Sequence, residues 1–135
     1  MRVPTYIDAD TNRLSEVPEG DFLSTVGSGI AEGHVVLTGT VPAADLSKAG
    51  SFELTLAGST TVSFSNPPSG GTCGFSFAVT QDAGASGFTV AWPAGVKWPD
   101  GTAPELTAEA GKTDVFVFTT SDGTNYTGMS AGKNI

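Results

Sequence analysis

The chain has 135 residues, a formal net charge of −8 and a single cysteine, Cys73. This length suits one domain with an appended segment, and the negative charge argues against binding to nucleic acid or anionic membranes, which need a basic surface. One cysteine allows no intramolecular disulfide, and no apolar run is long enough to cross a membrane as a helix.

The composition predicts an all-β fold. Valine, phenylalanine and threonine stand in short runs separated by 18 glycines and 8 prolines, the residues that favour turns. No long window shows the apolar repeat of about 3.6 residues that indicates an amphipathic helix. We therefore expect an antiparallel β-sandwich or a partly open barrel of about seven to nine strands, with an extended N-terminal arm.

The arm is predicted from residues 1–34, which hold six acidic residues, only two arginines and few apolar side chains. Such a segment cannot build its own core, so we assign residues 1–34 to an extended acidic arm and residues 35–135 to the β-sandwich module. The spaced large apolar residues of the arm are expected to bind a partner protein as the arm orders on it. These residues are Tyr6, Ile7, Leu14, Val17, Phe22 and Leu23.

The arm also contains a spacing that resembles a calcium-binding loop. The residues at the ligand positions are Asp8, Asp10, Asn12, Glu16 and Glu19. Arg13 stands where the sharp turn of such a loop wants glycine, and Pro4 and Pro18 disfavour the flanking helices. Acidic segments produce this spacing by chance, so we predict no metal site and leave calcium as an open alternative.

The first strands of the module are expected over residues 34–41, followed by a link over residues 42–48. The only histidine, His34, is interpreted as a strand-edge residue, because no cysteine or second histidine accompanies it as a ligand. Apolar residues alternate with polar ones over residues 51–57 and again over residues 60–65, as in half-buried strands. The intervening Gly58-Ser59 predicts that these two strands form a hairpin.

Two later strands suggest contact with another chain. Residues 72–81 alternate large apolar residues with small ones, and a small-residue face suits packing against another sheet or chain. Residues 114–120 are apolar on both faces, which predicts a central strand or one buried by a partner. A turn at residues 121–124 returns the chain as a last strand over residues 125–131. These two strands motivate the prediction of a homotrimer.

Both tryptophans lie in the stretch over residues 88–107, and each is followed by proline. Proline disfavours helix for the residue before it, so Trp92 and Trp98 are expected on extended backbone, in strands over residues 87–92 and 96–98. Because a tryptophan buries a large apolar area, we interpret both as core anchors. The alternative is an exposed sugar-binding platform built from Trp92, Trp98 or Tyr126.

No catalytic constellation is found in the sequence. A serine hydrolase needs a base, but His34 has no local partner and no G-x-S-x-G turn occurs. Cys73 has apolar or neutral neighbours, which do not activate a thiolate. The carboxylates stand in the arm and at turns, where aspartate is favoured for backbone reasons. We predict a non-enzymatic protein with no catalytic residues and no cofactor.

Several segments resemble a β-module common in virion proteins of tailed bacteriophages. They are T-V-S-F-S-N-P-P at residues 61–68, T-Q-D at 80–82, V-A-W-P-A-G-V-K-W-P at 90–99, G-T-A-P-E-L-T at 101–107, D-V-F-V-F-T-T at 114–120 and G-K at 132–133. The resemblance covers most of the chain from Ser51 onward, and an aromatic residue after the final turn, as in many relatives, matches Tyr126. It implies a structural β-module of head-decorating, tail-fibre or baseplate proteins, with no catalytic residues.

The resemblance leads to an expected function. A chain of 135 residues has little length beyond the module, which favours a decoration or cement protein that docks on the capsid lattice through its arm. The alternatives are a short tail-fibre or baseplate component that binds a receptor, and a carbohydrate-binding module that binds a host glycan. The expected partners are other virion proteins. Since no signal peptide begins the chain, we expect synthesis in the bacterial host cytoplasm and assembly into the virion.

Overall fold

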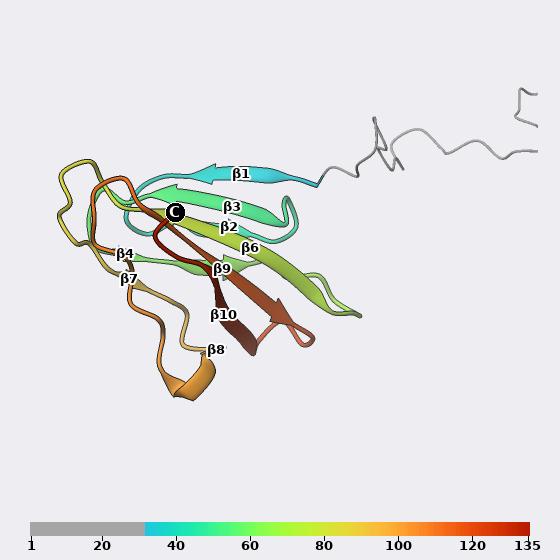
Figure 1. Ribbon diagram of the computed structural model, residues 1–135. Coiled ribbons are helices and arrows are strands. Elements are labelled where there is room, and N and C mark those ends of the chain that lie inside the picture. Colours follow the sequence, from blue (N-terminus) through green and yellow to red (C-terminus); the bar gives the residue numbers. More distant parts are fainter. Residues whose placement is uncertain (1–31) are drawn as a thin grey trace, which may run out of the picture. The chain divides into compact units, whose positions relative to one another are not determined.

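The computed structural model describes residues 32–135, which contain ten β-strands and one short 3-10 turn (Figure 1). The all-β prediction is confirmed. The elements are β1 (His34–Leu37), β2 (Ala43–Asp45), β3 (Ser51–Thr55), β4 (Thr60–Thr61), β5 (Ser63–Ser65), β6 (Cys73–Thr80), β7 (Val90–Ala91), β8 (Val96–Lys97), η1 (Pro99–Gly101), β9 (Thr113–Thr120) and β10 (Tyr126–Gly132).

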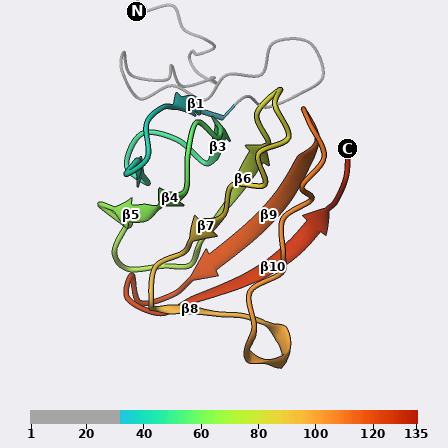
Figure 2. The ribbon, with the colours of Figure 1, turned by 90° about the vertical axis from the view of Figure 1, so that its left-hand side faces the viewer.

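One six-stranded sheet is the larger layer, with the strand order β1-β3-β6-β9-β10-β8. The strands β1, β3 and β6 run parallel, β9 is antiparallel to both β6 and β10, and β8 is parallel to β10. Figure 2 shows β6, β9 and β10 side by side. The sheet is therefore mixed, and the prediction of an antiparallel architecture was wrong in this respect.

A second layer is built from shorter extended segments. β2 pairs in parallel with β5, and β4 pairs in parallel with β7. Further backbone hydrogen bonds join Thr61 N to Thr40 O at 2.8 Å and Val62 N to Ala91 O at 2.9 Å. The chain therefore passes back and forth between the two layers. It places β1, β3 and β6 in the large sheet, and residues 40–46, 60–65 and 89–91 in the second layer.

The prediction of a hairpin over residues 51–65 was wrong, because its two strands lie in different layers. β3 pairs with β1 and β6, whereas β4 and β5 pair with strands of the second layer. The Gly58-Ser59 turn carries the chain from one layer to the other. Alternation identified the residues that face the core, but the same pattern arises when two strands pair and when they pack across a core.

The core lies between the two layers. Alternate residues of β3, β6 and β9 point into it, and Ala44, Leu46 and Val62 come from the segments opposite. Phe52, Phe77, Phe116 and Phe118 are at most 1% exposed. Burying a phenylalanine contributes about 1.5–3 kcal/mol, so these rings form the main apolar source of stability.

The predicted C-terminal elements agree with the structure better than the middle ones. β9 lies between β6 and β10, which confirms the prediction of a central strand, and β9 and β10 form the expected hairpin. Residues 87–92 and 96–98 contribute only the two-residue strands β7 and β8, and residues 42–48 contain β2 rather than only a link.

The described residues contain no helix long and apolar enough to cross a membrane.

Candidate functional site

The two tryptophans pack against the phenylalanines of the core. The Trp92 ring lies 5.4 Å from Phe77 and 5.1 Å from both Phe116 and Phe118, measured between ring centroids. The Trp98 ring lies 6.0 Å from Trp92 and 5.6 Å from Phe118. These are distances at which aromatic pairs attract. Both indoles are half-buried, so each also presents part of its surface outside the core.

Tyr126 is buried at 6% exposure and cannot present a free ring to a sugar. Its ring lies 5.0 Å from Phe64 and 6.2 Å from Phe75. Burial raises the pKa of its hydroxyl, and the nearby Cys73 thiol and Asp122 carboxylate act in the same direction. The three aromatic residues of the sugar-platform alternative therefore do not form one exposed surface.

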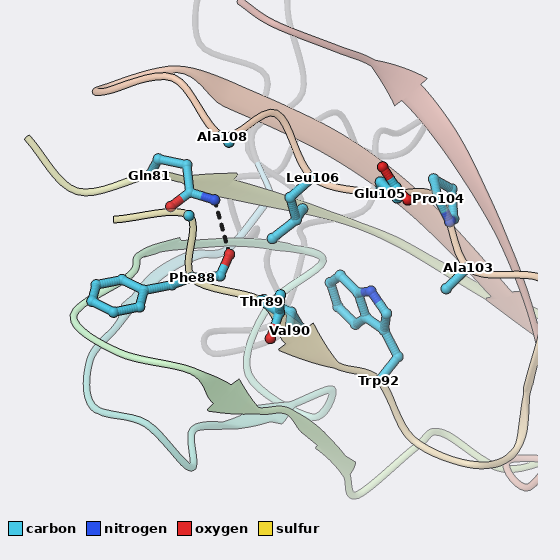
Figure 3. Close-up of a pocket in the computed structure, with 11 residues that line it drawn as sticks. Gln81, Phe88, Thr89, Val90, Trp92, Ala103, Pro104, Glu105, Leu106 and Ala108 are labelled. Carbon is cyan, nitrogen blue, oxygen red and sulfur yellow. Dashed lines mark hydrogen bonds between the residues drawn. The ribbon is translucent and has the colours of Figure 1, made fainter. Parts of the chain in front are cut away.

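A cavity of about 350 Å³ lies beside Trp92. Figure 3 shows Gln81 and Phe88 at one end and Trp92 and Ala103 at the other. The walls come from the end of β6, the approach to β7 and the loop before β9. The lining residues are Gln81, Gly87, Phe88, Thr89, Val90, Trp92, Ala103, Pro104, Glu105, Leu106 and Ala108.

Gln81 is the most buried polar group of this cavity, with 3% exposure. Its Nε2 donates a hydrogen bond to the Phe88 carbonyl oxygen at 2.9 Å. Its Oε1 has no hydrogen-bond partner among residues 32–135. A buried acceptor without a partner costs roughly 1–3 kcal/mol, so this oxygen lowers the stability of the module.

The loop that forms one wall of the cavity is held by Asp114, which is 2% exposed. Its carboxylate accepts hydrogen bonds from Thr107 N at 2.6 Å, Thr107 Oγ1 at 2.8 Å and Asn134 N at 2.9 Å. Lys133 Nζ lies 3.6 Å from the carboxylate and also donates to the Glu105 carbonyl. Burial acts to raise the pKa of Asp114, but these hydrogen bonds and the Lys133 charge outweigh it and lower the pKa.

A second hollow of about 330 Å³ lies at the β9–β10 turn and is lined mainly by threonines and other polar residues. Asp122 organises this turn, since its Oδ1 accepts from the backbone of Thr124 and Asn125 at 2.8 Å each. The Asn125 side chain donates to Oδ2 at 2.9 Å and is the first of the interactions that hold the pKa of Asp122 far below its usual range. The carboxylate is thus already used by its own turn.

The large sheet also has an outer face, defined here as the side of β3, β6, β9 and β10 that points away from the core. Residues in register share a face, so Ser76, Ala78, Val115, Val117 and Met129 lie together on it. On β6, β9 and β10 this face carries no charged side chain. The four side chains on β6 and β9 are half-buried, and Met129 is 43% exposed. The small face predicted for residues 72–81 is found here.

His34 lies on β1, which is an edge strand of the sheet. Its ring nitrogens lie 2.8 Å from Ser51 Oγ and 2.8 Å from Glu53 Oε1, and all three side chains project from neighbouring strands. Within residues 32–135 no three histidine, cysteine or acidic side chains come close enough to hold a metal ion. Cys73 is half-buried and free.

The predictions for the arm lie outside the described residues. They are the partner-binding residues Tyr6, Ile7, Leu14, Val17, Phe22 and Leu23, and the calcium-like spacing from Asp8 to Glu19. The structure shows two buried polar residues, Gln81 and Asp114, that the sequence analysis placed only at strand ends. A polar residue at the end of an apolar strand was their only signal.

Comparison with known protein families, with curated proteins and with solved structures found no match to this chain. The phage-module resemblance therefore stands on the residues quoted from the sequence alone.

Proposed function

We propose that this chain is a non-catalytic structural protein of a tailed-bacteriophage virion and acts as a decoration or cement protein on the capsid. The observation that carries the proposal is the ordered set of W-P, K-W-P and G-T-A-P segments over residues 90–107, with the flanking strands. The same residues form the stretch from β7 to the cavity wall, packed on the core through Trp92 and Trp98. A structural role for this stretch is consistent with the resemblance.

The outer face supports a role in assembly. Interface cores are depleted in charged residues, and the outer face of β6, β9 and β10 is free of them. We assign this face to contact between copies of the chain in a homotrimer. The small side chains of Ser76 and Ala78 would let another sheet approach closely.

The arm is proposed to attach the module to the particle. Its acidic residues would face basic residues of a capsid subunit, and its apolar residues would be buried on that subunit. Electrostatic attraction between exposed charges is screened by salt, so attachment should weaken as ionic strength rises.

The proposal is tested by adding purified protein to particles that lack it and measuring the bound copies. Full-length protein should bind to the head, whereas protein without residues 1–24 should remain folded and fail to bind. The truncated protein is the matched comparison, because it retains every strand that the structure describes. Binding of the truncated protein at full occupancy would assign attachment to the module, and binding of neither protein would refute the decoration role.

A further inference from the structure

The hollow of about 330 Å³ at the β9–β10 turn is lined by groups that form hydrogen bonds. Each lining residue carries a hydroxyl, amide, carboxylate or ammonium group. Four of the hydroxyls form no hydrogen bond within residues 32–135 and are at least partly open to solvent, and they belong to Thr72, Thr119, Ser121 and Thr127. A hydroxyl can both donate and accept, so these groups are able to bind a polar ligand.

Three of the lining side chains form a row across the large sheet. Thr119 of β9 is in register with Thr127 of β10, and Thr127 is in register with Lys97 of β8. Residues in register share a face, and neighbouring strands lie about 4.8 Å apart, so one small ligand can contact all three. Gly74 of β6 continues the row beside Thr119 and has no side chain to cover its end.

The turn beside this row is held in place by its own hydrogen bonds. The Asp122 carboxylate accepts from the backbone of Thr124 and Asn125 and from the Asn125 side chain. The buried Thr120 hydroxyl donates to the Asn125 carbonyl oxygen at 2.8 Å and accepts from Gly123 N at 2.9 Å. A wall that is ordered before a ligand arrives loses little conformational entropy on binding, which favours affinity.

The charges and the aromatic content of the lining limit the ligand class. One cation and one carboxylate, Lys97 and Asp122, line the hollow, so an anion attracted by the lysine would also be repelled by the aspartate. Tyr126 is the only aromatic lining residue and is 6% exposed, so it offers no surface on which an aromatic ligand could stack. An uncharged ligand with several hydroxyls fits this lining best.

We propose that this hollow binds an uncharged pyranose sugar, whose hydroxyls form hydrogen bonds with Thr119, Thr127 and the Lys97 ammonium group. The volume lies near the lower end of the range for ligand pockets, which is roughly 300–1,000 Å³, and suits one sugar ring. Because Lys97 and Thr127 are exposed, the ring can belong either to a free monosaccharide or to a polysaccharide. This site is independent of the position of the protein on a virion.

The test compares neutral sugars with probes that lack one of their properties. The methyl glycosides of glucose, galactose, mannose and N-acetylglucosamine are titrated into the full chain while amide NMR shifts are recorded. Cyclohexanol is the control with a single hydroxyl, and inorganic phosphate is the control with a negative charge. We expect at least one glycoside to give saturable shifts at residues 119–127, with an affinity in the millimolar range and at least tenfold above both controls.

Three results would overturn the proposal. They are the absence of saturable shifts with all four glycosides at tens of millimolar, shifts confined to residues outside the hollow, and binding of cyclohexanol or phosphate as tight as that of every sugar. A trisaccharide of the best-binding sugar then distinguishes the two sources. Binding at least as tight as that of the methyl glycoside indicates a polysaccharide, whereas loss of binding indicates a free monosaccharide.

Two variants test the row of side chains directly. Thr127→Val replaces the hydroxyl by a methyl group, so the affinity for the sugar should fall about fivefold, and Lys97→Met removes a charged donor and should lower it about tenfold or more. Thr61→Val and Lys48→Met are the matched controls, because both residues are exposed and lie outside the hollow. Unchanged affinity in both Thr127→Val and Lys97→Met, or equal losses in the controls, would refute the assignment.

Discussion

Replacing Asp114 is expected to destabilise the module more than any other change of a single aspartate. The Asp114 carboxylate joins the first residues of β9 to the cavity loop and to the C-terminal tail. Asp114→Ala would leave the Thr107 amide, the Thr107 hydroxyl and the Asn134 amide without their acceptor.

The magnitude follows from these three donors. Each buried donor that loses its acceptor costs roughly 1–3 kcal/mol, and donors that water can reach fall at the low end. Thr107 is half-buried and Asn134 is exposed, so we expect Asp114→Ala to lower the free energy of unfolding by about 3–5 kcal/mol. Asp114→Asn retains one acceptor oxygen, and its loss should be about 1–3 kcal/mol.

The same carboxylate gives the stability a pH dependence. Burial acts to raise the pKa of Asp114, but the hydrogen bonds and Lys133 lower it in the folded state. The unfolded carboxyl therefore takes up its proton at a higher pH than the folded one. The stabilisation is complete above the unfolded pKa, which is about 3.9, and is lost as the pH falls from there through the folded pKa. Asp114→Asn should flatten this part of the profile.

Urea unfolding followed by tryptophan fluorescence, at neutral pH and through the acid range, measures both effects. Asp82→Asn is the matched control, because the Asp82 carboxylate also accepts several hydrogen bonds but only from Gly84 and Ser86 of its own turn. Its change in unfolding midpoint should be much smaller. Equal midpoints for Asp114→Ala and the unmodified chain, or equal losses for Asp82→Asn and Asp114→Asn, would refute the reasoning.

Three further outcomes are expected. Trp92→Ala and Trp98→Ala should each cost about 3–5 kcal/mol in a denaturation experiment, and a stable, soluble double variant would contradict their role as core anchors. Gly128→Ala should destabilise the module, because the new Cβ would lie 2.8 Å from Trp98 Cζ3. Gly74→Ala should be tolerated, because its Cβ would come no closer than 3.7 Å to the nearest atom, Thr119 Cγ2. Native mass spectrometry should find a homotrimer that Val117→Lys on the outer face dissociates without lowering the melting temperature. A monomer at micromolar concentration would exclude the trimer.

Much of the burial could be predicted from the sequence. Alternation over residues 51–57 and 72–81 identified Phe52, Leu54, Phe75 and Phe77 as core residues, and all four are buried. The turn at residues 121–124 joins neighbouring strands, so its hairpin was also predicted. Both features depend on residues close together in the chain.

The parallel pairing and the cavity could not be predicted in this way. A period of two residues shows which side chains of a strand face the core, but it does not show which strand lies beside it. The pairing of β1 with β3 and of β3 with β6 could therefore not be read from the local sequence. Asn134, a partner of Asp114, lies 20 residues away along the chain. The Gln81 side chain donates to the Phe88 carbonyl across a loop, seven residues further along the chain.

The central claim is that this protein is a structural component of a virion head. Gold-labelled antibodies against the β-module, applied to purified phage particles produced in the presence of this chain, test it most directly. We predict label distributed over the capsid surface, with a copy number per particle that matches positions of the capsid lattice. Label confined to the tail would contradict the decoration role, and particles without label would contradict a structural role in the virion.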